Sequence, residues 1–234
     1  MQRFKLIIER RRPGGSAPPS GFRLAEETPN YRVWRRTGAL PQAHASVGAG
    51  TVSGTAPLDC SNPDVRGVLD AARERGVPVR YARHARPVVS SPKDWYVYGI
   101  IQPGPQAPYI LRRGGYISTQ PALERGRYDA WIQGSFGAGV RLYSAGKAIG
   151  EIHGDLGQQD QWHRLGTFDV RRDRPVVSMI GLAKPGWQSG SRRPDITGQI
   201  AYTPVASGER VDEVAGARAE QRLCGRTLDW IELP

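Results

Sequence analysis

The chain has 234 residues, of which 38% are hydrophobic, with 29 glycines, 19 prolines and a formal net charge of +11. This length suits one large domain, or a domain with a smaller layer beside it, and the glycine and proline content favours strands joined by many turns. No apolar run approaches the roughly 20 residues of a membrane helix. The composition therefore excludes a low-complexity disordered chain and a membrane-spanning helix within this sequence.

The positive charge is concentrated near the N-terminus. Residues 1–36 carry nine basic and three acidic side chains, which accounts for +6 of the +11, and the densest run of arginines lies in residues 9–15. Clustered cations can bind nucleic-acid phosphates, but the rest of the chain is only mildly basic. We therefore expect no nucleic-acid partner.

Residues 1–87 are predicted to form a small N-terminal α/β layer with a connector. Residues 4–11 have the pattern of a short strand, and residues 21–37 that of a hairpin with its turn at Pro29–Asn30. Residues 38–59 have the composition of a loose segment rich in small residues. The clearest helix follows: Ser61 or Asn62 can cap it, Pro63 suits its first position, and Gly76 can end it. Its apolar stripe, at i, i+3, i+4 and i+7, consists of Val65, Val68, Leu69 and Ala72.

Residues 88–205 contain only strand and turn signals, and residues 206–234 close the chain. Short strands at roughly ten-residue spacing are typical of a β-sandwich or jelly roll. In the third of these strands, alternation places Tyr128, Ala130 and Ile132 on one face and Asp129, Trp131 and Gln133 on the other. The last segment is predicted to form a short helix, then a strand that returns to the N-terminal layer. The fold class is therefore mainly β, a jelly-roll or β-sandwich with a small α/β layer. The candidate strands are 95–101, 108–112, 127–133, 139–144, 148–153, 163–170, 175–182 and 196–203.

Two cysteines, Cys60 and Cys224, lie far apart in the sequence. Neither belongs to a CxxC pair or has a neighbouring histidine, which argues against zinc. They are either two separate buried thiols or one long-range disulfide, and the residues alone do not decide between these alternatives.

Catalytic signatures such as GxSxG, HExxH and GxxxxGK[ST] are absent from the sequence. Nothing fixes an acid–base pair of carboxylates, so we predict no catalytic residue and no cofactor apart from a structural Ca²⁺. The oxygen ligands for such a calcium would come from Glu151, Asp155 and Asp160. The alternative is a polar loop in solvent.

The aromatic residues offer a binding hypothesis. Sugar rings stack their C–H faces on aromatic rings, while nearby polar groups bond the hydroxyls. Trp187 lies in a polar, glycine-rich stretch together with Gln188, Arg192 and Asp195, and Trp162 lies in a second polar stretch. These five residues are the predicted ligand-binding set. The alternative for each tryptophan is a place in the core.

Several segments together resemble a known family. They are "PPSGFRLAEETPNYRVWRR", "LDCSNPDVRGVLDAA", "LERGRYDAWIQGSFGAGVRLYSAGKAIGEI", "WHRLGTFDV" and "RLCGRTLDWIEL". In this order they resemble the C-terminal soluble region of actinobacterial polytopic membrane proteins of the GT-C, glycosyltransferase-like type, although Asn30 stands where the family often doubles a tyrosine. The residues that carry the resemblance are Trp34, Arg35, Cys60, Trp131, Gly134, Gly146, Trp162, Cys224, Asp229 and Trp230.

The resemblance implies an extracytoplasmic domain at the membrane, which favours a Cys60–Cys224 disulfide. It also implies that catalytic carboxylates lie in an upstream transmembrane portion of the same protein. The functional hypothesis is a non-catalytic, carbohydrate-binding-like domain that helps to position cell-envelope glycan. Two alternatives are a purely structural or partner-docking sandwich and a hydrolase, which would need two carboxyl groups about 5–10 Å apart in a cleft.

Overall fold

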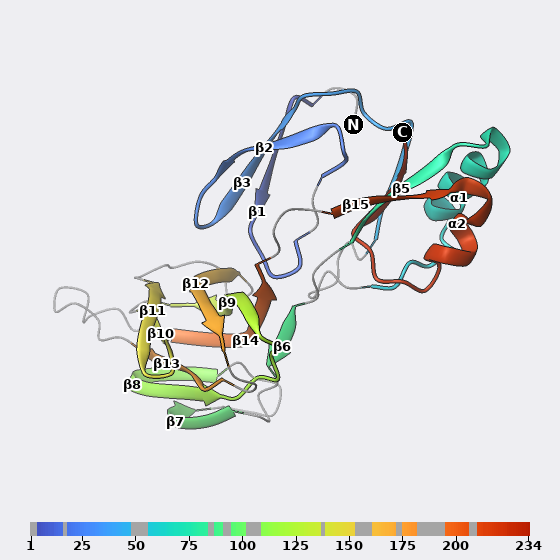
Figure 1. Ribbon diagram of the computed structural model, residues 1–234. Helices are drawn as coiled ribbons and strands as arrows, with labels where there is room; N and C mark the ends of the chain where they lie inside the picture. The colour runs from blue at the N-terminus through green and yellow to red at the C-terminus, as the bar shows by residue number, and fades with distance from the viewer. Residues whose placement is uncertain are drawn as a thin grey trace. The chain divides into compact units, whose positions relative to one another are not determined.

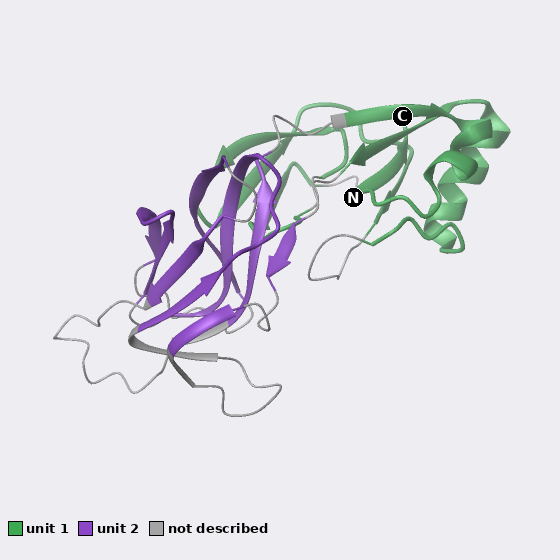
Figure 2. Cartoon of the chain, turned by 60° about the horizontal axis from the view of Figure 1, so that its bottom comes forward, with its two compact units in different colours: residues 1–86, 206–234 green, residues 87–205 purple. Residues whose placement is uncertain are grey.

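The computed structural model describes residues 4–15, 18–47, 56–83, 87–90, 95–101, 109–136, 139–152, 161–171, 175–181, 195–205 and 210–234. The chain divides into two compact units (Figure 2). Unit 1 comprises residues 1–86 and 206–234, and unit 2 comprises residues 87–205. Most of the elements are antiparallel strands, so the expectation of a mainly β fold is confirmed.

Unit 2 is a β-sandwich built from one continuous sheet that folds over on itself (Figure 1). The fold occurs because β8 changes partner along its length: residues 116–119 pair with β13, whereas residues 109–111 pair with the start of β14. The first layer contains, in spatial order, β7 (Trp95–Ile101), β8 (Tyr109–Thr119), β13 (Val177–Gly181), β10 (Val140–Ser144) and β11 (Lys147–Ile152). The second contains β6 (Val88–Ser90), β14 (Asp195–Pro204), β9 (Gly126–Ser135) and β12 (Trp162–Val170).

One hydrophobic core fills the space between the two layers. Ile117 and Met179 from the first layer and Ile132 and Ile200 from the second are fully buried in the same cluster. In β9 the inward residues are Tyr128, Ala130 and Ile132, as the alternation predicted. Because alternate residues of a strand point to opposite faces, this core also determines which side chains the outer faces present.

In its described segments, unit 1 contains two smaller sheets and two helices. One sheet has the order β1 (Leu6–Arg10), β3 (Tyr31–Arg36), β2 (Phe22–Glu27), and the other has the order β15 (Arg210–Ala215), β5 (Pro78–Arg83), β16 (Trp230–Leu233), β4 (Ala43–Ser46). The helices are α1 (Pro63–Arg75) and α2 (Gly216–Leu223). The predicted apolar stripe of α1 is buried in a second hydrophobic core. This core also contains residues of α2 and of the four-stranded sheet.

The ends of α1 follow from the sequence. The Asn62 side chain accepts hydrogen bonds from the backbone N–H groups of Asp64 and Val65, and Gly76 adopts a left-handed conformation with φ 65°. A side-chain cap of this kind contributes about 1 kcal/mol. Between the two candidate caps, Asn62 is the one that the structure selects.

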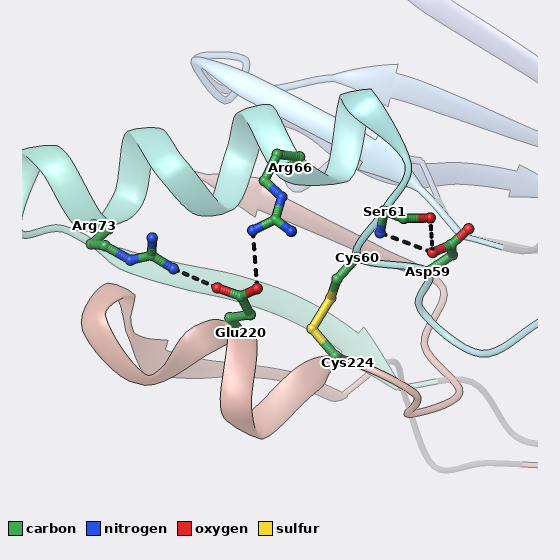
Figure 3. The surroundings of a disulfide bond; sticks show 7 residues. All are labelled: Asp59, Cys60, Ser61, Arg66, Arg73, Glu220 and Cys224. Atoms are coloured by element: carbon green, nitrogen blue, oxygen red, sulfur yellow. Dashed lines mark hydrogen bonds and ion pairs between the residues drawn. A yellow bond between two sulfur atoms is a disulfide. The ribbon is translucent and has the colours of Figure 1, made fainter.

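Cys60 and Cys224 form a disulfide between the start of α1 and the end of α2, with their Cα atoms 5.7 Å apart (Figure 3). Glu220 of α2 lies beside it, 2.5 Å from an Arg73 nitrogen and 3.0 Å from an Arg66 nitrogen of α1. These ion pairs lower the pKa of the Glu220 carboxyl, chiefly through the hydrogen bond from Arg73. The disulfide and the ion pairs therefore hold the two helices together at several points.

Four strands differ from the sequence-based expectation. The candidate strand 108–112 continues as β8 to Thr119. Residues 38–59 contain β4, which pairs with β16, and β6 precedes the first expected strand of the sandwich. Residues 210–215, expected to belong to the C-terminal helix, form β15 instead. This segment pairs along its whole length with β5, and that pairing outweighs its own moderate helix propensity.

Candidate functional site

The outer face of the first layer of the sandwich carries a cluster of tyrosines. The strand register places Tyr98 directly opposite Tyr116, and Tyr96 opposite Ser118, while the intervening Val97 pairs with the buried Ile117. Directly opposed residues share a face, so the tyrosines point away from the core. Tyr143 of β10 opposes Ser178, which in turn opposes Ser118, so it lies on the same face. We call the outward residues Tyr96, Tyr98, Tyr116 and Tyr143 the tyrosine face.

The rings of Tyr96 and Tyr98 are exposed, and both lie beside the ring of Tyr116. They are 68% and 66% exposed. The ring centroids of Tyr98 and Tyr116 are 5.8 Å apart with an interplanar angle of 28°, and those of Tyr96 and Tyr116 are 5.9 Å apart at 38°. Isolated exposed aromatics are common on proteins, but a contiguous group marks a binding surface.

Polar groups continue the same face across β13, β10 and β11. The register places Arg141 between Ile180 and Glu151, and the Arg141 Nε lies 2.5 Å from a Glu151 carboxylate oxygen. Hydrogen bonds to Tyr143 and then to Glu151 raise the pKa of the Arg141 guanidinium. The Ser178 hydroxyl donates to the Ser118 hydroxyl at 3.2 Å. Hydroxyl, guanidinium and carboxylate groups thus stand beside the exposed rings.

The Tyr116 phenol remains a neutral donor and acceptor at ordinary pH. Partial desolvation, and then the hydrogen bond with Tyr96, raises the pKa of the Tyr116 phenol. A phenol with a raised pKa keeps its proton, so it can both donate to and accept from a ligand hydroxyl.

A groove of about 560 Å³ adjoins one end of the tyrosine face. Tyr96 belongs to both the groove and the tyrosine face, and Ser118, Gln120, Ser90 and Thr119 add polar groups to the lining of the groove. Inside the groove's wall, the Trp95 indole N–H donates to the Ser90 hydroxyl, which lies 2.9 Å from the Thr119 hydroxyl. A volume of this size lies within the range of small-ligand sites.

Trp162, a predicted ligand-binding residue, lies on the outer face of the second layer. It opposes Gln133 of β9, is 8% exposed, and packs with Trp131 and Ala201 in a small cluster. A ring covered to this extent presents little surface for stacking. Its position corresponds to the core alternative considered for each tryptophan.

The other members of the predicted ligand-binding set are not brought together by the described structure. Trp187, Gln188 and Arg192 lie outside the described residues. Asp195 is the first residue of β14, where it pairs with Leu111 of β8. A site at these residues stays a prediction.

The predicted calcium ligands have a similar outcome. Glu151 is the partner of Arg141, and a guanidinium at that distance competes with a metal ion for the carboxylate. Asp155 and Asp160 lie outside the described residues. No group of three or more His, Cys, Asp or Glu side chains suited to a metal ion occurs among the residues that the structure describes.

The tyrosine face was not identified from the sequence. The available signal was the alternation in "WYVYG", residues 95–99, in which Trp95 and Val97 take one side and the two tyrosines the other. That pattern could have located Tyr96 and Tyr98. It could not have placed Tyr116 beside them, because that depends on the extension of β8 beyond residue 112 and on its register against β7.

Comparisons with known proteins give a limited result. No protein-family model matches the chain, and no curated protein matches it. Among solved structures, the chain is similar to a GH26-CBM35 β-(1,4)-mannanase of Podospora anserina, with a TM-score of 0.41 and 15% identity over 54% of this chain. This chain covers only 29% of that mannanase.

Two further solved structures show weaker likeness. One is the CBM36-1 domain of a multidomain xylanase from the hindgut metagenome of Trinervitermes trinervoides, with a TM-score of 0.37, 11% identity, and coverage of 55% of this chain and 98% of that domain. The other is a PA14 sugar-binding domain from an RTX adhesin, with a TM-score of 0.29, 10% identity, and coverage of 73% of this chain and 92% of that domain. All three TM-scores are below 0.5.

Proposed function

We propose that this chain is a non-catalytic, carbohydrate-binding-like domain that binds glycan on the tyrosine face. The observation that carries the proposal is the exposure of Tyr96 and Tyr98 beside Tyr116, on a sheet face that also holds an arginine–glutamate pair and two serine hydroxyls. Aromatic rings can stack on the C–H faces of sugars, and the polar groups can bond the hydroxyls.

The proposed setting is the extracytoplasmic side of a membrane, as part of a longer glycosyltransferase-like protein, where the domain would hold cell-envelope glycan for an upstream catalytic portion. Two observations support this setting. The Cys60–Cys224 disulfide suits an oxidising compartment, and the sequence resembles the soluble region of such proteins. Among the described residues, no helix is long and apolar enough to cross a membrane.

Calorimetric titration of the chain with arabinan, galactan and mannan fragments tests the proposal. We expect binding of at least one fragment, and we expect Tyr98→Ala to weaken it about tenfold, which corresponds to the ~1.4 kcal/mol of one stacked ring. Tyr31→Ala is the matched control, because Tyr31 is also an exposed strand tyrosine, 42% exposed, but belongs to unit 1.

A structural or partner-docking sandwich without sugar binding is the second candidate, and the burial of Trp131 and Trp162 favours it. The same titration separates the two functions. If no envelope glycan binds at millimolar concentration, the glycan-binding proposal fails and the structural function stands.

A further inference from the structure

The three-stranded sheet of unit 1 has one face that is apolar, exposed and basic. The register of β1 against β3 places Leu6 opposite Arg35, Ile8 opposite Val33 and Arg10 opposite Tyr31. These six residues share a face, which we call the β1–β3 face. The opposite face holds Trp34, which is buried at 8% exposure.

The apolar side chains of the β1–β3 face are unusually open to solvent. Ile8 is 68% exposed, Leu6 is 49% exposed and Tyr31 is 42% exposed, and Phe4, just before the strand, is 65% exposed. A soluble domain normally buries large aliphatic residues on one face of a sheet, and a grouped exposed set marks an interaction surface.

Cations surround these apolar groups. Arg10 and Arg35 lie on the face itself, and β2 adds Arg23, which opposes Arg35. The Arg10 guanidinium lies over the Tyr31 ring, 5.7 Å from its centroid. Within the three strands, Glu26 is the one carboxylate that the register assigns to this face. The face therefore combines an apolar centre with a net positive rim.

A groove of about 590 Å³ adjoins the face at one end of β1 and β3. Its lining contains Lys5, Arg35 and Arg36 together with Leu6, Thr37 and Gly38. Three cations beside an exposed leucine fit a ligand that is anionic at one end and hydrocarbon at the other.

We propose that the β1–β3 face docks on the surface of an anionic phospholipid bilayer. The aliphatic and aromatic side chains enter the boundary between headgroups and acyl chains, as the apolar side of an interfacial helix does. The arginines reach the lipid phosphates, and the groove seats one headgroup. A second copy of this chain is a poorer occupant, since two positive rims would repel each other. This proposal is independent of glycan binding, which we assign to the other unit.

Flotation of the full chain with phosphatidylglycerol-containing vesicles, compared with pure phosphatidylcholine vesicles, tests the docking. We expect binding to the anionic vesicles that weakens as salt rises. Arg35→Gln should weaken it about fivefold, the usual effect of one cation near a charged membrane, and Ile8→Ser about tenfold through lost apolar burial. All of these residues are exposed, so the variants should keep the wild-type thermal unfolding.

Matched controls remove a similar group elsewhere. Arg218→Gln removes an exposed arginine of α2, and Val176→Ser removes an apolar residue of unit 2 that is 46% exposed. Both should bind vesicles like the unchanged chain. Equal weakening by Arg218→Gln and Arg35→Gln would show non-specific charge attraction and overturn the proposal, as would absence of binding at low salt. Self-association that Ile8→Ser abolishes would instead assign the face to a second copy.

Discussion

At the scale of single residues, Gly150 shows how tightly the open edges of the two sandwich layers meet. An added Cβ atom at Gly150 of β11 would lie 1.9 Å from the carbonyl oxygen of Leu165 in β12. Backbone cannot yield as a flexible side chain can, so only glycine allows β11 and β12 to approach this closely. The glycine thereby helps to close the sandwich along this edge.

We therefore expect Gly150→Ala to lower the free energy of unfolding by about 1–3 kcal/mol, the usual cost of overpacking. Chemical denaturation followed by circular dichroism measures this change. Gly67→Ala is the control: Gly67 lies on the exposed side of α1 with no atom near its added Cβ, so alanine should stabilise the chain by about 0.5–1 kcal/mol. Equal stability of Gly150→Ala and the unchanged chain would mean that β11 and β12 do not meet in this way.

The alternation of residues predicted which side chains of a strand point into the core, but it did not predict the tyrosine face. The alternation in β9 gave its inward residues, because a core accepts only the apolar set. The tyrosine face depends instead on which strands are neighbours. Tyr116 joins Tyr96 and Tyr98 only through the pairing of β7 with β8, and a register between distant segments is not encoded in either segment alone.

At the scale of elements, the disulfide is the clearest feature of unit 1. It joins residues 164 positions apart, but the intervening chain includes the whole of unit 2. When unit 2 is folded, the freely varying loop shrinks to roughly 45 residues. The chain-entropy contribution of the bond is then about 4 kcal/mol rather than about 5.

Replacing both cysteines, Cys60→Ser with Cys224→Ser, should lower the unfolding free energy of unit 1 by about 2–4 kcal/mol. Thermal and chemical unfolding with and without reductant measures this effect. The unchanged chain in reductant should match the double variant, and reductant should not alter the variant. Identical stability of all four samples would show that the bond constrains nothing in the unfolded chain.

Elements with strong local signals were predictable, and those that depend on partners were not. The boundaries of α1 follow from Asn62, Pro63 and Gly76. The segment that forms β4, "AHAS", is short and has no strand signal of its own, and it forms a strand because the edge of β16 is available. The β15 segment resembles the start of a helix until its pairing with β5 is known.

At the scale of the whole molecule, each unit has its own hydrophobic core. Among the residues that the structure describes, sixteen buried ones form the core of unit 2, and fourteen others form that of unit 1. A separate core is the main requirement for independent folding. Unit 2 is one continuous segment, whereas unit 1 is built from two separate segments, residues 1–86 and 206–234.

Residues 87–205 expressed alone should therefore fold, unfold in one cooperative transition, and retain any affinity of the full chain for glycan fragments. Circular dichroism, thermal scans in reductant and the same titrations measure these properties. The transition should be insensitive to reductant, because both cysteines lie in unit 1. An unfolded fragment would show that unit 2 requires unit 1.

The place where unit 2 joins unit 1 has one more consequence. Arg83 and Arg210 are paired across β5 and β15, and Val88 and Tyr202 are paired across β6 and β14. The chain therefore leaves unit 1 and returns to it at neighbouring residues, and unit 2 is an insertion between β5 and β15. Deleting residues 84–209 and linking Arg83 to Arg210 by a tight turn would leave a simple β-hairpin of β5 and β15. The insert could therefore be removed or exchanged while the sheets of unit 1 keep their strand pairing.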